Sequence, residues 1–170
     1  MTISMHSASA PVFARILGNM LHWMEAAKAH AEAKKFDTSV YMTLRLAPDM
    51  LPFPRQIQIL SDAAKGCMAR LAGQTAPSWE DNEATLDDLI ARIKKTQDYV
   101  LSVPAAEVNG SEDREIIIPR RQGDPYKFTG EVYLKHFATP NFYFHATTAY
   151  ALLRQAGVPL GKMDFLGAPS

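Results

Sequence analysis

The chain has 170 residues, a length that suits one domain and is short for two. Its 18 basic and 18 acidic residues cancel, so the overall charge argues against nucleic acid or an anionic membrane as partner. The single cysteine, Cys67, excludes an internal disulfide, and no apolar run reaches the length of a membrane span. We therefore predict one domain over residues 1–170 in a reducing compartment, the cytoplasm.

The first half of the chain has the apolar spacing of two amphipathic helices. Apolar residues recur every three or four positions in residues 9–33, and Ser9 is a candidate N-cap. Residues 54–72 repeat the pattern and are followed by Gly73, which suits a left-handed helix end. The less periodic stretch 36–50 between them predicts a short helical turn or an irregular crossing.

A third helix is predicted from about Leu86, with Thr85 or Asn82 as its N-cap, and the pattern changes at its end. Its apolar face, in which we include Leu101, stops at Pro104. A short β-branched run, a turn rich in glycine and proline and a second short run follow, and they predict a β-hairpin within residues 113–129. An isolated hairpin is marginal, so we expect it to pack against the helices.

The last long helix is predicted over about residues 130–157, with Val132 and Phe144 on its inner face. Pro140 in its middle should kink or interrupt it, because proline removes one backbone hydrogen bond. The tail, residues 158–170, is partly apolar, and we expect it to be extended and to pack back on the bundle. These elements predict a mainly α fold with a small hairpin inserted before the last long helix.

The most unusual polar cluster lies on this last helix, in Pro140-Asn-Phe-Tyr-Phe-His145 and the threonines after it. Asn141, His145 and Thr148 fall on about the same side, along the apolar stripe. Polar groups that face a bundle interior must be hydrogen-bonded. One interpretation is a ligand or metal site around His145, and the other is a structural histidine satisfied by its neighbours.

Two glutamines of the 54–72 helix are further candidates for lining a ligand pocket. Gln56 flanks the apolar stripe and can reach inward, whereas Gln58 lies four residues before Asp62 on what reads as a solvated polar face. No glycine-rich phosphate loop, serine nucleophile elbow or Cys/His metal spacing occurs in the chain. The sequence therefore carries none of the familiar enzyme signatures.

Four segments resemble the bacterial family catalogued as domain of unknown function 1993, DUF1993, and the likeness extends over nearly the whole chain. The segments are Ala47-Pro-Asp-Met-Leu-Pro-Phe-Pro-Arg-Gln-Ile-Gln58, Ala63-Ala-Lys-Gly66, Phe137-Ala-Thr-Pro-Asn-Phe-Tyr-Phe-His-Ala-Thr-Thr-Ala-Tyr150 and Gly157-Val-Pro-Leu-Gly-Lys-Met-Asp-Phe-Leu-Gly167. That family is similar to the DinB-like superfamily. The resemblance implies an antiparallel four-helix bundle with one long crossover, often assembled as a homodimer.

The resemblance also implies where a site would lie. Many DinB-like proteins bind a divalent metal with three histidines, one from the second helix and two spaced four apart on the fourth. His145 matches one of these positions, Asn141 falls on its partner, and the second-helix position falls near Gln56 or Gln58. Amides are poor ligands for zinc or nickel, so we expect no cofactor beyond a weakly bound divalent metal at His145.

Three functions follow as hypotheses. The leading one is a DinB-like bundle without the three-histidine site that binds a small polar ligand through the polar core, as a homodimer. The second is a metal-dependent transferase or hydrolase, in which His145 and non-histidine groups hold the ion. The third is a protein-interaction module that uses the hairpin or the tail around Leu160 and Phe165.

Overall fold

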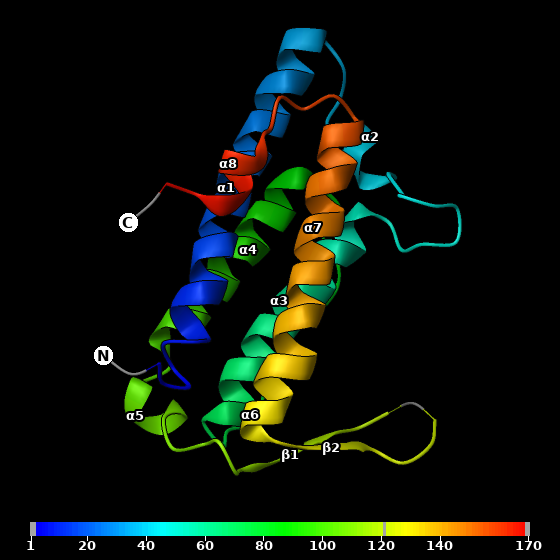
Figure 1. Ribbon diagram of the computed structural model, residues 1–170. Helices are drawn as coiled ribbons and strands as arrows, with labels where there is room; N and C mark the ends of the chain where they lie inside the picture. The colour runs from blue at the N-terminus through cyan, green and yellow to red at the C-terminus, as the bar shows by residue number, and fades with distance from the viewer. Residues whose placement is uncertain (1–2, 121, 169–170) are drawn as a thin grey trace.

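The computed structural model describes residues 3–120 and 122–168, so positions 121, 169 and 170 of the predicted hairpin and tail lie outside the described residues (Figure 1). In chain order the elements are α1 (Ala10–Lys34), α2 (Ser39–Met42), α3 (Phe53–Leu71), α4 (Leu86–Ser102), α5 (Ala105–Val108), β1 (Glu115–Ile118), β2 (Tyr126–Thr129), α6 (Gly130–Tyr133), η1 (Leu134–Ala138), α7 (Thr139–Gln155) and α8 (Lys162–Leu166). The mainly α fold, with a hairpin before the last long helix, is confirmed.

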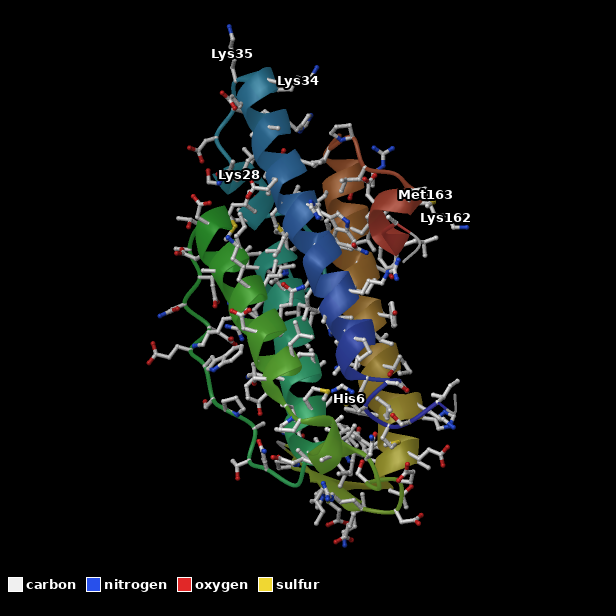
Figure 2. The ribbon with its side chains drawn as sticks, turned by 90° about the vertical axis from the view of Figure 1, so that its left-hand side faces the viewer. His6, Lys28, Lys34, Lys35, Lys162 and Met163 are labelled. Carbon is white, nitrogen blue, oxygen red and sulfur yellow. The ribbon has the colours of Figure 1, made fainter. Side chains whose placement is uncertain are left out.

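Four long helical segments form the bundle: α1, α3, α4 and the run from α6 to α7. Helix α1 packs on α4, and α3 packs on both α4 and α7. Helices α3 and α4 run in the same direction, so the chain between them, residues 72–85, returns along the outside of the bundle (Figures 1 and 2). We call this segment the crossover loop. None of the helices in the described part of the chain is both long and apolar enough to cross a membrane.

The ends of the helices show which of the predicted capping residues cap a helix in the structure. Thr85 and Asp88 form a capping box at the start of α4: the Asp88 amide donates to Thr85 Oγ1 at 3.2 Å, and the Thr85 amide donates to Asp88 Oδ2 at 2.9 Å. Helix α3 ends just before Gly73, whose φ of +72° is the left-handed conformation expected there. Ser9 precedes α1, but its hydroxyl donates to the Met5 carbonyl at 2.7 Å and caps nothing.

The last long helix is interrupted next to Pro140, as predicted. Residues Leu134–Ala138 form one wide π-helical turn, and α7 then begins with Pro140 in its first turn, where no amide donor is needed. The wide turn shifts the phase of the helix. Phe144 is 55% exposed and Val132 is also exposed, so their predicted places on the inner face are wrong.

Leu101, predicted on the inner face of α4, is exposed as well, because it follows the buried Val100 at the edge of the stripe.

The hairpin packs on the bundle through aromatic side chains: the Phe128 ring centroid lies 5.3 Å from that of Phe137 and 6.0 Å from that of Tyr133. In β1, Ile116 is buried and pairs with Phe128 across the strands.

The tail folds back on α1, and part of it is helical where we expected an extended chain. Its α8 turn lies against the N-terminal half of α1 (Figure 1). The Trp23 indole donates to the Asp164 carbonyl at 2.9 Å, and its ring stacks on Phe165 at 5.4 Å between centroids. Met163 and Lys162 point outward from α8 (Figure 2).

Candidate functional site

The predicted site residues come from two adjacent helices, α3 and α7, but the structure brings only two of them into contact. His145 and Gln56 are 89 positions apart in the chain, and His145 Nδ1 lies 2.7 Å from Gln56 Oε1. Both side chains are buried: His145 is 8% exposed and Gln56 is 1% exposed. The pair therefore ties α7 to the start of α3 inside the bundle.

The hydrogen bonds of Gln56 determine which nitrogen of His145 carries a proton. The Gln56 amide nitrogen donates to the Leu51 carbonyl at 2.8 Å, and a carbonyl can only accept. The amide oxygen is therefore the atom that faces His145, and it too can only accept. Nδ1 of His145 must donate the bond, so it carries a hydrogen.

The other ring nitrogen, His145 Nε2, faces a different environment. Burial lowers the pKa of His145 below its ordinary value, because the charged imidazolium is poorly solvated there. At neutral pH the ring is therefore the Nδ1–H tautomer, with a lone pair on Nε2. Within residues 3–120 and 122–168, Nε2 has no hydrogen-bond partner, and it is absent from the fully buried unpaired atoms, so solvent reaches it.

The remaining predicted residues are engaged elsewhere. Thr148 lines an open, mostly apolar groove of about 390 Å³, but its hydroxyl donates to the Phe144 carbonyl one turn back at 2.8 Å. Gln58 turns to the opposite side of α3, where its amide donates to Glu83 Oε2 at 2.8 Å. Asn141 is half-buried and lines a cavity of about 150 Å³ between α3 and the α6–α7 run.

These residues do not fit a three-histidine metal site. His145 Nδ1 is occupied by Gln56, and both ends of the Gln56 amide are already hydrogen-bonded. The other histidines are not at this site; His30, for example, bonds the Tyr41 hydroxyl at 2.8 Å. Among the described residues no three His, Cys, Asp or Glu side chains gather in a way that could hold a metal ion. One imidazole nitrogen beside amides is a weak donor set for zinc or nickel.

Two further residues, which the sequence pattern did not single out, share the cavity lined by Asn141. Tyr133, from α6, is 1% exposed, and Arg70, near the end of α3, donates to its hydroxyl with Nη1 at 3.1 Å. Burial raises the pKa of Tyr133 to about 12, so the phenol is protonated at neutral pH. A usable signal was Gly66, a glycine inside a helix, which leaves room for the Arg70 guanidinium.

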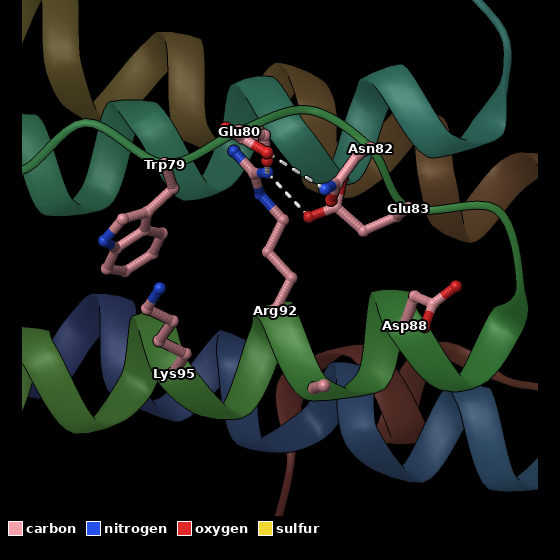
Figure 3. A pocket seen from close by; sticks show the side chains of 8 residues that line it. Trp79, Glu80, Asn82, Glu83, Asp88, Arg92 and Lys95 are labelled. Atoms are coloured by element: carbon pink, nitrogen blue, oxygen red, sulfur yellow. Dashed lines mark hydrogen bonds and ion pairs between the residues drawn. The ribbon is translucent and has the colours of Figure 1, made fainter.

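A cavity of about 520 Å³ lies under the crossover loop (Figure 3). Arg92 rises from α4 to the middle of it and binds Glu83 at 2.7 Å, Asp81 at 2.9 Å, Asp62 at 3.3 Å and the Glu80 carbonyl at 3.0 Å. These bonds attach the loop to α4 and α3. The arrangement is that of a structural clamp, because acceptors of the protein itself already bind both Nη atoms of the cation.

Trp79 of the crossover loop extends this clamp. Lys95 Nζ lies 4.4 Å from the centre of the indole ring (Figure 3). Lys65 Nζ lies 4.8 Å from the same centre, and the Tyr99 ring meets the indole edge-on. Burial alone would raise the pKa of Glu83, but hydrogen bonds from Arg92 and Gln58 outweigh burial and lower it. Glu83 is therefore a carboxylate that holds the loop in place.

Comparisons with known proteins agree with this fold. The model of the family DUF1993, described as a domain of unknown function, matches residues 5–166. The crystal structure of a DinB family member protein from Shewanella denitrificans is similar, with a TM-score of 0.86 and 39% sequence identity over 96% of this chain and 92% of that chain. No curated protein matches the sequence.

Proposed function

This chain belongs to the family DUF1993, a domain of unknown function, and we propose from its own residues that it binds a small polar ligand through His145. The hydrogen bond between His145 Nδ1 and Gln56 Oε1 carries the proposal. It orients the ring and leaves Nε2 as a hydrogen-bond acceptor that solvent reaches. The ligand would present an O–H or N–H group to this nitrogen.

The cost of the arrangement supports a binding role. A largely buried imidazole loses part of its hydration, a cost that an alanine or leucine at this position would not have. The Gln56 side chain, itself anchored on the Leu51 carbonyl, fixes the ring in one tautomer. Such pre-orientation lowers the entropy lost when a ligand binds.

The test uses two probes of nearly equal size, isopropanol and acetone, on protein labelled with ¹⁵N at histidine. Isopropanol can donate a hydrogen bond to Nε2, whereas acetone can only accept one. We expect the ¹⁵N resonance of His145 Nε2 to shift with isopropanol and not with acetone. The exposed His22 on α1 is the internal control, and its resonances should respond equally to both probes.

Either of two results would contradict the proposal. The ¹⁵N spectrum could show a protonated Nε2 and an unprotonated Nδ1, which would reverse the tautomer derived above. Alternatively, His145 and His22 could respond alike to isopropanol, which would mean that Nε2 of His145 offers no site.

The metal-dependent transferase or hydrolase remains the alternative, and zinc titration of the same sample distinguishes it. Because the donor set is weak, we expect His145 to show no saturable response to stoichiometric zinc. Stoichiometric binding that disappears in His145→Gln would favour the metalloenzyme.

The proposal includes three further expectations, on oligomeric state, on an interaction surface and on cellular location. We propose that the protein is a homodimer, as the resemblance implies, and light scattering at micromolar concentration tests it. Deleting the chain after Gly157 tests the interaction module, because α8 exposes Met163 and Leu166, which would be part of its contact. A cytoplasmic location agrees with one unpaired thiol, Cys67, which is fully buried and whose pKa is raised by burial.

A further inference from the structure

The Tyr133 hydroxyl is a buried donor that lacks an acceptor. Its one hydrogen bond within the described residues comes from Arg70 Nη1, at 3.1 Å. A guanidinium has only N–H donors, so the hydroxyl oxygen accepts in this bond and its own hydrogen remains available. A buried hydroxyl hydrogen without a partner is costly, and here it belongs to a residue that lines the Asn141 cavity.

Arg70 lacks the partner that an arginine usually has in such a place. It is half-buried, lines the same cavity, and has no carboxylate within ion-pair distance among the described residues. Asp62 also lines the cavity, but it is held by Lys65 at 2.5 Å and by Arg92 at 3.3 Å. The positive charge of Arg70 is therefore uncompensated.

Helix α3 is shaped to hold the guanidinium in this position. A Cβ atom at Gly66, one turn before Arg70, would lie 2.4 Å from Nη1. Glycine in a helix interior costs about 1 kcal/mol relative to alanine. The absence of a side chain at Gly66 lets Arg70 lie back along the helix, with its guanidinium carbon 6.0 Å from the centre of the Tyr133 ring.

The rest of the cavity defines the size and polarity of what it can hold. Its volume is about 150 Å³, close to that of an apolar cavity known to hold benzene, so a ligand of about six heavy atoms fits. Asn141 adds an amide donor and Asp62 a carboxylate already paired with Lys65 and Arg92, and the remaining walls are apolar: Ile59, Ala63, Ile118, Phe137 and Ala138. A ligand that complements this site has an anionic oxygen group and a short apolar body.

We propose that this cavity binds a short-chain carboxylate, which accepts hydrogen bonds from Arg70, Tyr133 and Asn141. One uncompensated cation matches a monoanion, and the nearby Asp62 disfavours a dianion such as hydrogen phosphate. The apolar walls then bury the alkyl chain of the acid. This site does not depend on the tautomer of His145, which lies one helical turn further along α7.

The experiment is a titration of the full chain with sodium butyrate, followed by backbone amide NMR and calorimetry. We expect saturable binding with shifts confined to the cavity. Arg70→Met should weaken binding about 10- to 100-fold, because a charge-assisted hydrogen bond is lost, and Tyr133→Phe should weaken it about 3- to 10-fold. Butyramide, the neutral analogue, should bind at least about 10-fold more weakly than butyrate.

A matched control separates the site from general charge effects. Arg120 lies 4.7 Å over the Tyr126 ring on the exposed hairpin, the same residue pair as in the cavity but open to solvent. Arg120→Met should leave butyrate binding unchanged. If it weakens binding as much as Arg70→Met does, or if butyramide binds as well as butyrate, the proposal is wrong.

Gly66→Ala tests the position of the guanidinium without removing its charge. The added methyl group should push Nη1 away from Tyr133 and reduce butyrate affinity about 10-fold while the protein stays folded. Saturable binding of phosphate without binding of butyrate would overturn the carboxylate assignment. The isopropanol response of His145, read from the same samples, shows separately whether the function proposed for that residue fails.

Discussion

Two arginines of this bundle are surrounded in opposite ways. Arg92 is 4% exposed and is enclosed by three carboxylates and a backbone carbonyl under the crossover loop. Arg70 is half-buried beside a cavity, and among the described residues its polar contacts are with the hydroxyl and ring of Tyr133. The first cation is neutralised by the fold itself, whereas the second is left for something outside the chain. From this difference we propose that the residues around Arg92 maintain the structure and that the residues around Arg70 bind a ligand.

The largest expected effect tests the structural side of this comparison. Arg92→Leu leaves Glu83, Asp81 and Asp62 without their shared cation, and Glu83 is itself largely buried. Breaking a buried ion pair by removing one partner costs about 3–5 kcal/mol. We expect urea unfolding to show a loss of this size.

The control for Arg92 is the surface pair of Lys28 and Asp87, joined at 2.8 Å with the aspartate mostly exposed. Lys28→Met should leave the urea midpoint unchanged within error, because an exposed ion pair is screened by water. A loss below about 1 kcal/mol for Arg92→Leu would mean that the loop does not depend on the clamp.

The Arg92 cluster also shows where sequence reasoning reached its limit. The helices could be predicted, because apolar spacing, the Thr85 cap and Pro140 are local signals. Gln58, however, reads as part of a solvated face and is 3% exposed, because the crossover loop covers that face of α3. A covering loop is a long-range contact that leaves no periodic signal in the helix beneath it.

The residues of the candidate sites also differ in how far the sequence could identify them. His145 and Gln56 could be selected from one sequence because each flanks an apolar stripe and matches a position of the resembled family. Gly66 marks space beside Arg70, but the cavity between Arg70 and Tyr133 depends on the π-helical turn at Leu134–Ala138, which sets how the start of the last helix meets α3. Periodicity alone does not predict such a turn.

The second prediction concerns the alkaline stability of the Arg70 cluster. The Tyr133 pKa is about 12 in the folded protein and about 10 in an unfolded chain. As the pH rises from 10 to 12, the Tyr133 hydroxyl loses its proton in the unfolded chain but keeps it in the folded protein. This favours the unfolded chain, so the free energy of unfolding, which this group leaves unchanged below pH 10, falls over this range. The loss reaches at most about 2.7 kcal/mol.

The measurement is urea unfolding at several pH values between 9 and 12, on wild type and Tyr133→Phe. The variant should lack this part of the alkaline loss. Parallel curves for the two proteins would show that the Tyr133 hydroxyl ionises in the folded state as readily as in the unfolded chain.

The third prediction is a small effect on the same cluster. Arg70→Met removes one hydrogen bond to a neutral hydroxyl and also removes a half-buried charge, so the net loss of stability should be about 1 kcal/mol or less. It should therefore destabilise the protein far less than Arg92→Leu does, while it weakens butyrate binding about 10- to 100-fold. Equal losses in urea for the two variants would contradict the division into a structural and a binding cluster.

The smallest expected effect is a gain. Gly66→Ala replaces a helix-interior glycine, and the clash it creates, 2.4 Å to Arg70 Nη1, involves the mobile end of a side chain. The guanidinium can move, so the helix should gain up to about 1 kcal/mol of stability as binding is lost. Gly130→Ala is the contrasting control, because its Cβ would lie 1.9 Å from the Ser111 carbonyl oxygen, a backbone atom that cannot move aside. If Gly66→Ala destabilises the protein as Gly130→Ala should, then Gly66 is required for packing and is not an adaptation that places Arg70 at the cavity.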